Sequence, residues 1–388
     1  MHLDIEKILD RYPSVGDLEA RAKQRIPHFG WEYLASGTGI ETGLQRNRAA
    51  IDAVRFTPRL MRGNVSPQIG TELFGRTWSA PFGIAPVGLS GLMWPDAEGI
   101  LARTARDFNI PYCLSTVGCE TPEAVGAIAG GNCWFQLYPI IDKEIEADLV
   151  KRAADSGFSV LVVTVDVPEN STRERQRKAG MRGEPRMTPA RIAQILARPR
   201  WALETLRHGA PSFPMLHKYS REKSLRALSE FLGPQRLGEI DTNHLAQLRK
   251  LWKGPMVIKG IMHPDDAEIA VGLGADGIVV SNHGARQIDG TPASIEVLPA
   301  IARRVNGRAA ILFDSGVRTG LDVMRALAMG ADFVLCGRAF LFGVGALGQT
   351  GGDVVAKILR DDIVNNMHQI GASTIGSLSD YLHSPEAG

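Results

Sequence analysis

A histidine and an arginine lie three residues apart in one polar stretch of the sequence. His283 and Arg286 belong to residues 281–290, which directly follow the apolar run 277–280. Histidine is the side chain that most readily accepts a proton near neutral pH, and the planar guanidinium of arginine holds a carboxylate at two points. A base beside a carboxylate clamp suits chemistry at the carbon next to a carboxyl group. Solvated loop residues are the alternative for such a pair taken alone.

Eight short apolar runs along the chain predict buried strands, and the segments between most of them have helical patterns. Strand and helix alternating eight times indicate a parallel barrel, and the steady spacing favours it over an open doubly wound sheet. We therefore predict an α/β protein with one domain over residues 1–388: a (β/α)8 TIM barrel with an N-terminal helical extension and a long insertion after strand 4. The runs are 82–86, 112–115, 133–138, 160–165, 256–258, 277–280, 310–313 and 333–335, and the helical stretches include 95–107, 142–155, 264–273, 294–305 and 321–329.

Polar side chains stand at the end of nearly every predicted strand. Because parallel barrel strands open their carboxyl ends at one mouth, we expect these side chains to converge there and to form the functional site. They are Ser115, Gln136, Tyr138, Thr164, Asp166, Lys259, Ser281, His283, Arg286, Asp314, Gly337 and Arg338.

Lys259 allows two interpretations. A lysine in a barrel mouth can form a Schiff base with a carbonyl substrate, as in class I aldolases, or act as a fixed positive charge beside an anionic cofactor or enolate. Glycines with Arg318 and Arg338 follow strands seven and eight, where this fold commonly binds phosphate. A phosphorylated cofactor therefore fits better. The GxGxxG matches at 272–277 and 343–348 do not follow a strand and open a helix, so neither predicts a nicotinamide cofactor.

The composition, 44% hydrophobic and 22% charged, is ordinary for a globular protein. No run approaches the roughly 18 apolar residues of a membrane span, and the N-terminus lacks the pattern of a secretory signal. The segment before Tyr33 is too short for a haem-binding domain. Cys113, Cys119, Cys133 and Cys336 have no CxxC spacing, so we expect buried thiols in a reducing cytoplasm, with no metal site and no disulfide framework.

The predicted insertion, residues 171–237, is strongly basic and longer than a usual connection. Between Ser171 and Arg236 it has 15 Lys and Arg against 5 Asp and Glu, although the whole chain has a net charge of only +2. That small net charge gives the protein as a whole no nucleic-acid signature. A basic segment with apolar residues and a tryptophan suits the surface of an anionic membrane on the cytoplasmic side; a solvated lid or a subunit contact is an equal alternative. The apolar residues are Ile192, Ile195, Leu196, Trp201, Leu203 and Leu206.

Several motifs in the same order resemble the FMN-dependent L-2-hydroxy acid dehydrogenase/oxidase family, which includes L-lactate and (S)-mandelate dehydrogenases and glycolate oxidase. They are residues 33–37 (YLASG), 84–88 (IAPVG), 135–138 (FQLY), 164–166 (TVD), 257–260 (VIKG) and 281–290. The resemblance extends from about Tyr33 to the last helix. It implies an FMN flavoprotein that oxidises an L-2-hydroxy acid, lactate or mandelate, to the 2-oxo acid and passes electrons to a quinone or similar acceptor. It also implies a homotetramer.

The resemblance implies a role for each site residue. His283 would be the base, oriented by Asp166, and Arg286 with Arg173 would bind the substrate carboxylate. Tyr33 and Tyr138 would bond substrate oxygens, and Lys259 would lie beside the flavin ring. The expected catalytic residues are His283, Asp166, Arg286, Tyr138 and Lys259, and the expected FMN contacts are Pro86, Val87, Gly88, Ser115, Gln136, Thr164, Lys259, Ser281, Asp314, Ser315, Gly316, Arg318, Gly337 and Arg338.

The chain departs from the family pattern at a few positions. Ala285 and Ser315 replace glycines that are common in the family, and Val117 stands where some short-chain oxidases have tryptophan. Gly88 stands where several oxidases have alanine, which favours an acceptor other than oxygen. Three alternatives stay open: an oxygen-using oxidase that makes hydrogen peroxide, a Schiff-base lyase that uses Lys259, and a non-catalytic barrel that binds anionic partners.

Overall fold

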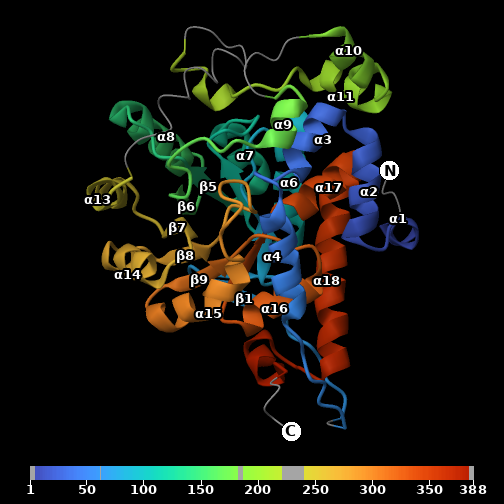
Figure 1. The fold of residues 1–388 in the computed structure, drawn as a ribbon. Helices are drawn as coiled ribbons and strands as arrows, with labels where there is room; N and C mark the ends of the chain where they lie inside the picture. Colours follow the sequence, from blue (N-terminus) through green and yellow to red (C-terminus); the bar gives the residue numbers. More distant parts are fainter. Residues whose placement is uncertain (1–4, 62, 182–186, 221–239, 384–388) are drawn as a thin grey trace.

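The protein folds into a closed barrel of eight parallel strands (Figure 1). A computed structural model describes residues 5–61, 63–181, 187–220 and 240–383. The strands pair in the order β10-β3-β4-β5-β6-β7-β8-β9, which confirms the predicted (β/α)8 barrel. They are β3 (Phe82–Ile84), β4 (Tyr112–Ser115), β5 (Cys133–Leu137), β6 (Val160–Thr164), β7 (Met256–Ile261), β8 (Gly277–Val280), β9 (Ala310–Phe313) and β10 (Phe333–Cys336).

Helices follow the barrel strands and cover the outside of the barrel. Polar side chains cap the amino-terminal ends of two of these helices. Asp142 accepts hydrogen bonds from the backbone amides of Glu144 and Ile145, and Thr121 caps a helix whose first residue is Pro122. These helices are α6 (Ala97–Phe108), α7 (Pro122–Ala129), α8 (Lys143–Asp155), α13 (Thr242–Leu251), α14 (Pro264–Gly272), α15 (Ser294–Val305), α16 (Gly320–Ala328) and α17 (Arg338–Leu347).

The amino-terminal helices α1 and α2 pack against α18 and α17, which lie late in the chain, on one side of the barrel (Figure 1). Leu18 and Ala22 of α2 are buried where α2 packs against α17, and α18 packs against α16 and α17. The extension predicted at the N-terminus is therefore helical. These outer elements are α1 (Ile5–Arg11), α2 (Val15–Arg25), α3 (His28–Ala35), α4 (Thr42–Ala53), α5 (Ser90–Met93), η2 (Gly348–Thr350), α18 (Gly351–Ile370) and η3 (Ile375–Tyr381).

The amino-terminal end of the barrel is closed by apolar side chains. A hairpin of β1 (Thr71–Leu73) and β2 (Arg76–Trp78) brings Trp78 against Trp134 of β5, with ring centroids 6.2 Å apart. Val257 and Phe333 belong to the same buried cluster. Since apolar packing fills this end, the barrel presents its polar residues at the carboxyl ends of the strands.

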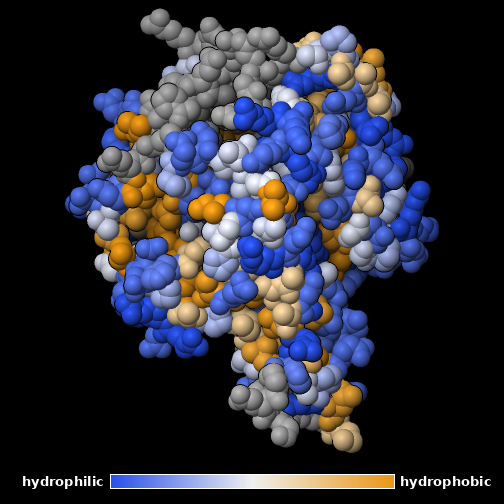
Figure 2. Space-filling view, viewed as in Figure 1, coloured by the Kyte–Doolittle hydropathy of each residue, from blue (hydrophilic) through white to orange (hydrophobic). Residues whose placement is uncertain are grey.

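The insertion after β6 lies at the carboxyl end of the barrel. It contains α9 (Glu174–Lys178), α10 (Pro189–Leu196), α11 (Pro199–His208) and η1 (Pro214–Leu216). Residues 182–186 and 221–237 of the predicted insertion fall outside the described residues. Figure 2 shows apolar residues among hydrophilic ones over α10 and α11.

One expectation for the insertion is wrong. Trp201 was expected to add to its apolar surface, but it is only 4% exposed. Its indole N–H donates to the carbonyl of Leu92 at 3.2 Å, and its ring meets Phe29 edge-on. The amphipathic helix α11 uses this large side chain as an anchor, whereas Leu196 and Leu206 are 72% and 83% exposed. Within the described ranges, no helix has the length and apolar character to cross a membrane.

Candidate active site

A cavity of about 630 Å³ opens at the carboxyl ends of the strands. Most of the predicted site residues line it: Tyr33, Pro86, Val87, Gly88, Gln136, Tyr138, Thr164, Arg173, Lys259, His283, Arg286, Asp314, Ser315, Gly316, Arg318, Gly337 and Arg338. The other three, Ser115, Asp166 and Ser281, stand behind the lining and bond to residues that form it. The fold thus gathers every predicted site residue at one place.

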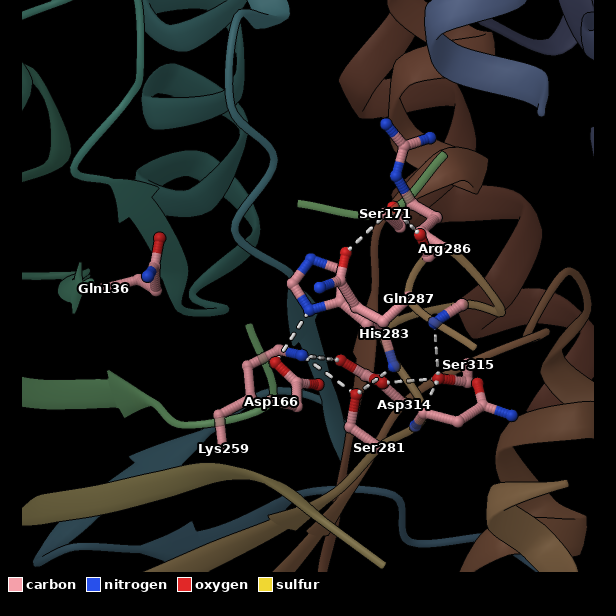
Figure 3. Close-up of polar contacts among 12 residues, drawn as sticks. Gln136, Asp166, Ser171, Lys259, Ser281, His283, Arg286, Gln287, Asp314 and Ser315 are labelled. Carbon is pink, nitrogen blue, oxygen red and sulfur yellow. Dashed lines mark hydrogen bonds and ion pairs between the residues drawn. The ribbon is translucent and has the colours of Figure 1, made fainter. Parts of the chain in front are cut away.

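His283 and Asp166 form an oriented pair in this cavity (Figure 3). The imidazole Nδ1 lies 2.8 Å from Asp166 Oδ1, just beyond the end of β6. Burial lowers the pKa of His283 and outweighs the attraction of Asp166, with Lys259 and Arg173 adding to the effect. Burial alone would raise the pKa of Asp166, but His283 and Lys259 outweigh it and hold this pKa below its usual value. The arrangement is a neutral imidazole held by an ionised carboxylate, which is the form a general base needs.

Lys259 forms a second pair, with Asp314. Its Nζ lies 2.9 Å from Asp314 Oδ2 and donates to the hydroxyl of Ser281 at 2.9 Å. Burial alone would lower the pKa of Lys259, but the carboxylates of Asp314 and Asp166 outweigh it and raise this pKa. A Schiff base requires a neutral amine. A firmly protonated Lys259 therefore acts as a fixed positive charge.

Arg286 lines the cavity without a carboxylate partner among the described residues. Its Nη1 donates to the carbonyls of Tyr33 at 2.8 Å and Ser36 at 3.1 Å, and the guanidinium lies over the Tyr33 ring. Burial, with nearby Arg173, lowers the pKa of Arg286 to about 10, which still leaves it charged at neutral pH. Arg173 donates to Ser171 and Gln287 instead of to an acid. Two cations that have no acidic partner among the described residues make this wall suited to bind an anion.

A second cationic wall lies after β9 and β10. Arg338 donates to the carbonyls of Leu34, Ser36 and Gly284, and the side chain of Arg318 lies over the ring of Phe342. Neither has an ion pair with an acid in the described part of the chain. Burial lowers the pKa of both guanidiniums. These loops keep positive charge where the fold commonly holds phosphate.

The residues fit a phosphorylated cofactor with a polar ring. The amide Nε2 of Gln136 is buried and has no hydrogen-bond partner among the described residues, while its Oε1 accepts from Ser115 Oγ at 2.7 Å. A ligand with an acceptor at this place would satisfy this buried donor. A Cβ at Gly88 would lie only 2.5 Å from Val117 Cγ2, so the loop after β3 has no room for a side chain there.

The apolar side of the cavity contains residues that the sequence did not point to. Met181 and Phe213 come from the insertion, and Val167 follows β6. The only signal for them was the place of the insertion, which starts at the mouth end of β6. The insertion therefore contributes part of the cavity wall.

The cysteines, the possible metal ligands and the two glycine motifs can also be located in the described chain. All four cysteines are free thiols, of which Cys119 is half-buried and the other three are buried. Described residues contain no cluster of three or more possible metal ligands. Gly272 ends α14 and Gly277 starts β8, and residues 343–347 lie inside α17. Neither glycine motif therefore opens a helix after a strand.

Comparison with known proteins gives a consistent result. The model of the family "FMN-dependent dehydrogenase" matches residues 22–384. The L-lactate dehydrogenase of Stenotrophomonas maltophilia is 41% identical over 350 residues, which cover 89% of this chain and 92% of that protein. The L-lactate dehydrogenase of Pseudomonas paraeruginosa is 39% identical over 94% of this chain and 96% of its own length.

Solved structures agree with the sequence relatives. The monotopic membrane protein (S)-mandelate dehydrogenase superposes with a TM-score of 0.91 at 34% identity, and the match covers 95% of this chain and 98% of that chain. Mandelate oxidase with (S)-4-hydroxymandelic acid superposes with a TM-score of 0.81 at 33% identity over 95% of this chain and 98% of the other.

Proposed function

The chain belongs to the FMN-dependent dehydrogenase family, and from this premise we propose that it oxidises an L-2-hydroxy acid of the lactate or mandelate type to the 2-oxo acid. One observation carries the proposal. A neutral His283 oriented by Asp166 shares a cavity with Arg286, which has no acidic partner among the described residues. A base and a free carboxylate clamp are what a 2-hydroxy acid requires.

Each side chain has a defined task in this proposal. Arg286 and Arg173 bind the substrate carboxylate, since a guanidinium matches its two oxygens. His283 takes a proton from the substrate, and Asp166 stabilises the resulting imidazolium. Tyr33 and Tyr138 hydrogen-bond substrate oxygens; burial raises the pKa of Tyr138, so its phenol stays a donor. Bound FMN supplies the acceptor for the two electrons.

The cavity offers FMN separate groups of residues for its ring, its ribityl chain and its phosphate. Gln136, Ser115 and Thr164 offer polar groups to the ring, and residues 86–88 lie along one wall of the cavity. The positive charge of Lys259 would stabilise negative charge on the reduced ring. Asp314, Gly316, Arg318, Gly337 and Arg338 would meet the ribityl chain and the phosphate.

The experiment is a turnover assay with an artificial electron acceptor. L-lactate and (S)-mandelate are supplied separately, with their mirror-image acids as matched controls, and the 2-oxo acid is measured. We expect product from at least one L-acid and none from its enantiomer. Stoichiometric hydrogen peroxide without added acceptor would identify an oxidase, and borohydride trapping of a substrate adduct would identify a lyase.

We further propose that α10 and α11 dock the enzyme on an anionic membrane surface and that electrons pass to a membrane quinone. Leu196, Leu203 and Leu206 are exposed on these helices among arginines, and a monotopic membrane protein has the same fold. We expect co-sedimentation with anionic vesicles at low salt, and loss of it in Leu196→Glu/Leu206→Glu. Equal sedimentation with neutral vesicles would contradict the electrostatic part.

We also infer that the protein assembles as a homotetramer. An arm projects from the barrel next to the carboxyl-terminal segment (Figure 1), and it exposes Leu60 at 63% and Met61 at 103%. Apolar residues on a projecting arm suit a contact with a second copy. Light scattering should give four times the chain mass of 42.0 kDa; a monomer at micromolar concentration would contradict the inference.

A further inference from the structure

The base stands on a turn that the backbone does not favour. His283, Gly284 and Ala285 have φ angles of +57°, +63° and +57°, in the left-handed region that side chains with a Cβ rarely adopt. Each of the three backbone amides donates to a side chain. The first, of His283, donates to Ser281 Oγ at 3.0 Å, the second, of Gly284, to Ser315 Oγ at 3.0 Å, and the third, of Ala285, to Asn282 Oδ1 at 3.1 Å. The orientation of His283 therefore depends on side chains that hold the turn.

Ser315 has a special place among these side chains (Figure 3). Its buried hydroxyl accepts the amides of Gly284 and Asn282, at 3.0 Å and 3.3 Å, and donates to Asp314 Oδ1 at 2.8 Å. The other oxygen of Asp314 pairs with Lys259. The Ser315 hydroxyl thus joins the turn of the base to the pair that carries the positive charge, through Asp314. The hydroxyl of Ser281 contacts the same pair from the other side, because it accepts from the His283 amide and from Lys259.

The bonds of Ser315 use the whole capacity of its hydroxyl. A serine has one donor and two acceptor lone pairs, and all three are engaged within the protein. Ser315 was expected to contact FMN as part of a loop whose backbone amides match a phosphate site, and its hydroxyl has no donor or lone pair left for that phosphate. A different role explains it better.

The serine is present at a cost to the backbone. Ser315 has φ +87°, an angle at which glycine is relaxed and any Cβ is strained. A residue chosen for folding alone would be glycine. What serine adds at this position is the hydroxyl and its three bonds.

We propose that Ser315 is a positioning residue for hydroxy acid oxidation: its hydroxyl fixes the left-handed turn that presents His283 and ties that turn to the Asp314–Lys259 pair. The proposal rests on the function proposed above. It assigns Ser315 no contact with substrate and no chemical step. The loss of the hydroxyl should slow the reaction by displacing the base, because small errors in position are costly in catalysis.

Three variants separate positioning from a structural role. Ser315→Gly removes the hydroxyl and also the backbone strain. Ser315→Ala removes the hydroxyl and keeps the strain. Ser315→Thr keeps the hydroxyl and adds a β-branched side chain at an unfavourable φ angle. Positioning predicts that rate follows the hydroxyl, so that the threonine variant is the fastest of the three. A structural role predicts that rate follows backbone relief, so that the glycine variant is the fastest.

Ser294→Ala is the matched control. Ser294 Oγ accepts the same Asn282 amide at 3.0 Å, but has no bond to Gly284 or Asp314 in the described structure. This variant loses a buried hydroxyl near the turn without breaking the link to the Lys259 pair.

The experiment measures anaerobic flavin reduction at saturating L-acid, thermal unfolding, and hydrogen exchange of residues 281–287, all on FMN-loaded protein. We expect Ser315→Gly and Ser315→Ala to be slowed about tenfold or more, with at least a fivefold recovery in Ser315→Thr. We expect faster exchange across 281–287 in the first two than in Ser294→Ala. A Ser315→Gly protein that matches the wild type in rate and exchange would overturn the proposal.

The two proposals fail in different ways. If no hydroxy acid reduces the flavin of the wild-type protein, the proposed function is wrong. The positioning of the turn is then still decided by hydrogen exchange, because that measurement does not need a substrate. Equal exchange in Ser315→Ala and Ser294→Ala would refute it.

Discussion

Two buried pairs in this cavity have nearly the same geometry and opposite behaviour. His283 lies 2.8 Å from Asp166, and Lys259 lies 2.9 Å from Asp314. Each joins a basic group to a carboxylate at the carboxyl end of the barrel. Yet the pKa of His283 is lowered from its usual value and the pKa of Lys259 is raised.

The difference comes from the second neighbours of each group. Lys259 is influenced by two carboxylates, those of Asp314 and Asp166, and together they outweigh the effect of burial. His283 has one carboxylate and two repelling cations, Lys259 and Arg173, so the effect of burial prevails. One pair therefore keeps its proton as a permanent charge, and the other is ready to accept one. A pair distance alone does not reveal the role of a base; the surrounding charges decide it.

The largest effect is expected from removing the base. In His283→Ala, flavin reduction by the L-acid should slow by about 10²–10⁴-fold, the usual contribution of a general base. FMN should remain bound, because the Lys259–Asp314 pair is untouched. Stopped-flow absorbance measures both, and near-normal reduction would refute the assignment of the base.

The next effect concerns the permanent charge. Lys259→Met leaves the carboxylate of Asp314 buried and unpaired, and breaking such a pair costs about 3–5 kcal/mol of folding free energy. FMN affinity should fall as well. Denaturant unfolding and FMN titration measure these losses. Lys218→Met is the control: Lys218 also pairs with an aspartate at 2.8 Å, but its side chain is 61% exposed, so the expected loss is within about 1 kcal/mol.

A smaller effect tests the carboxylate clamp. Arg286→Lys keeps the charge but loses the planar fork, so KM should rise by about tenfold, with a smaller change in kcat. Steady-state kinetics with each L-acid provide the measurement. A variant whose kcat falls while KM stays constant would place Arg286 in the chemical step instead.

The smallest effect is a matter of pH. His283 must be neutral to act, and its lowered pKa keeps it neutral down to a pH below its usual value of about 6.5. The profile of kcat/KM should thus fall on the acid side only below that pH. Because the pKa of Lys259 is raised, this side chain should keep its charge, and the profile should show no fall caused by its deprotonation below about pH 10. An acid limb above pH 7 would contradict the neutral base.

The sequence was sufficient for the barrel and for the residues at its mouth. Strands β4, β8 and β9 have the predicted bounds, because each is a run of four mainly apolar residues with a turn or polar residues after it, which leaves few alternatives. β3 ends at Ile84, two residues before the predicted end, in line with the lack of an amide hydrogen at Pro86.

Other features depend on contacts between distant segments. The burial of Trp201 requires Leu92 and Phe29, and the cavity contacts of Met181 and Phe213 require the path of the insertion. The task of the Ser315 hydroxyl depends on the turn at 283–285. None of these has a local pattern that predicts it.

The most direct test is the visible absorption spectrum of the purified protein, before and after anaerobic addition of L-lactate and then (S)-mandelate. A neutral base beside a free carboxylate clamp predicts flavin bands that bleach with at least one of these acids. Flavin bands unchanged by either acid would contradict the proposed substrates, and a colourless protein that does not take up FMN would contradict the account as a whole.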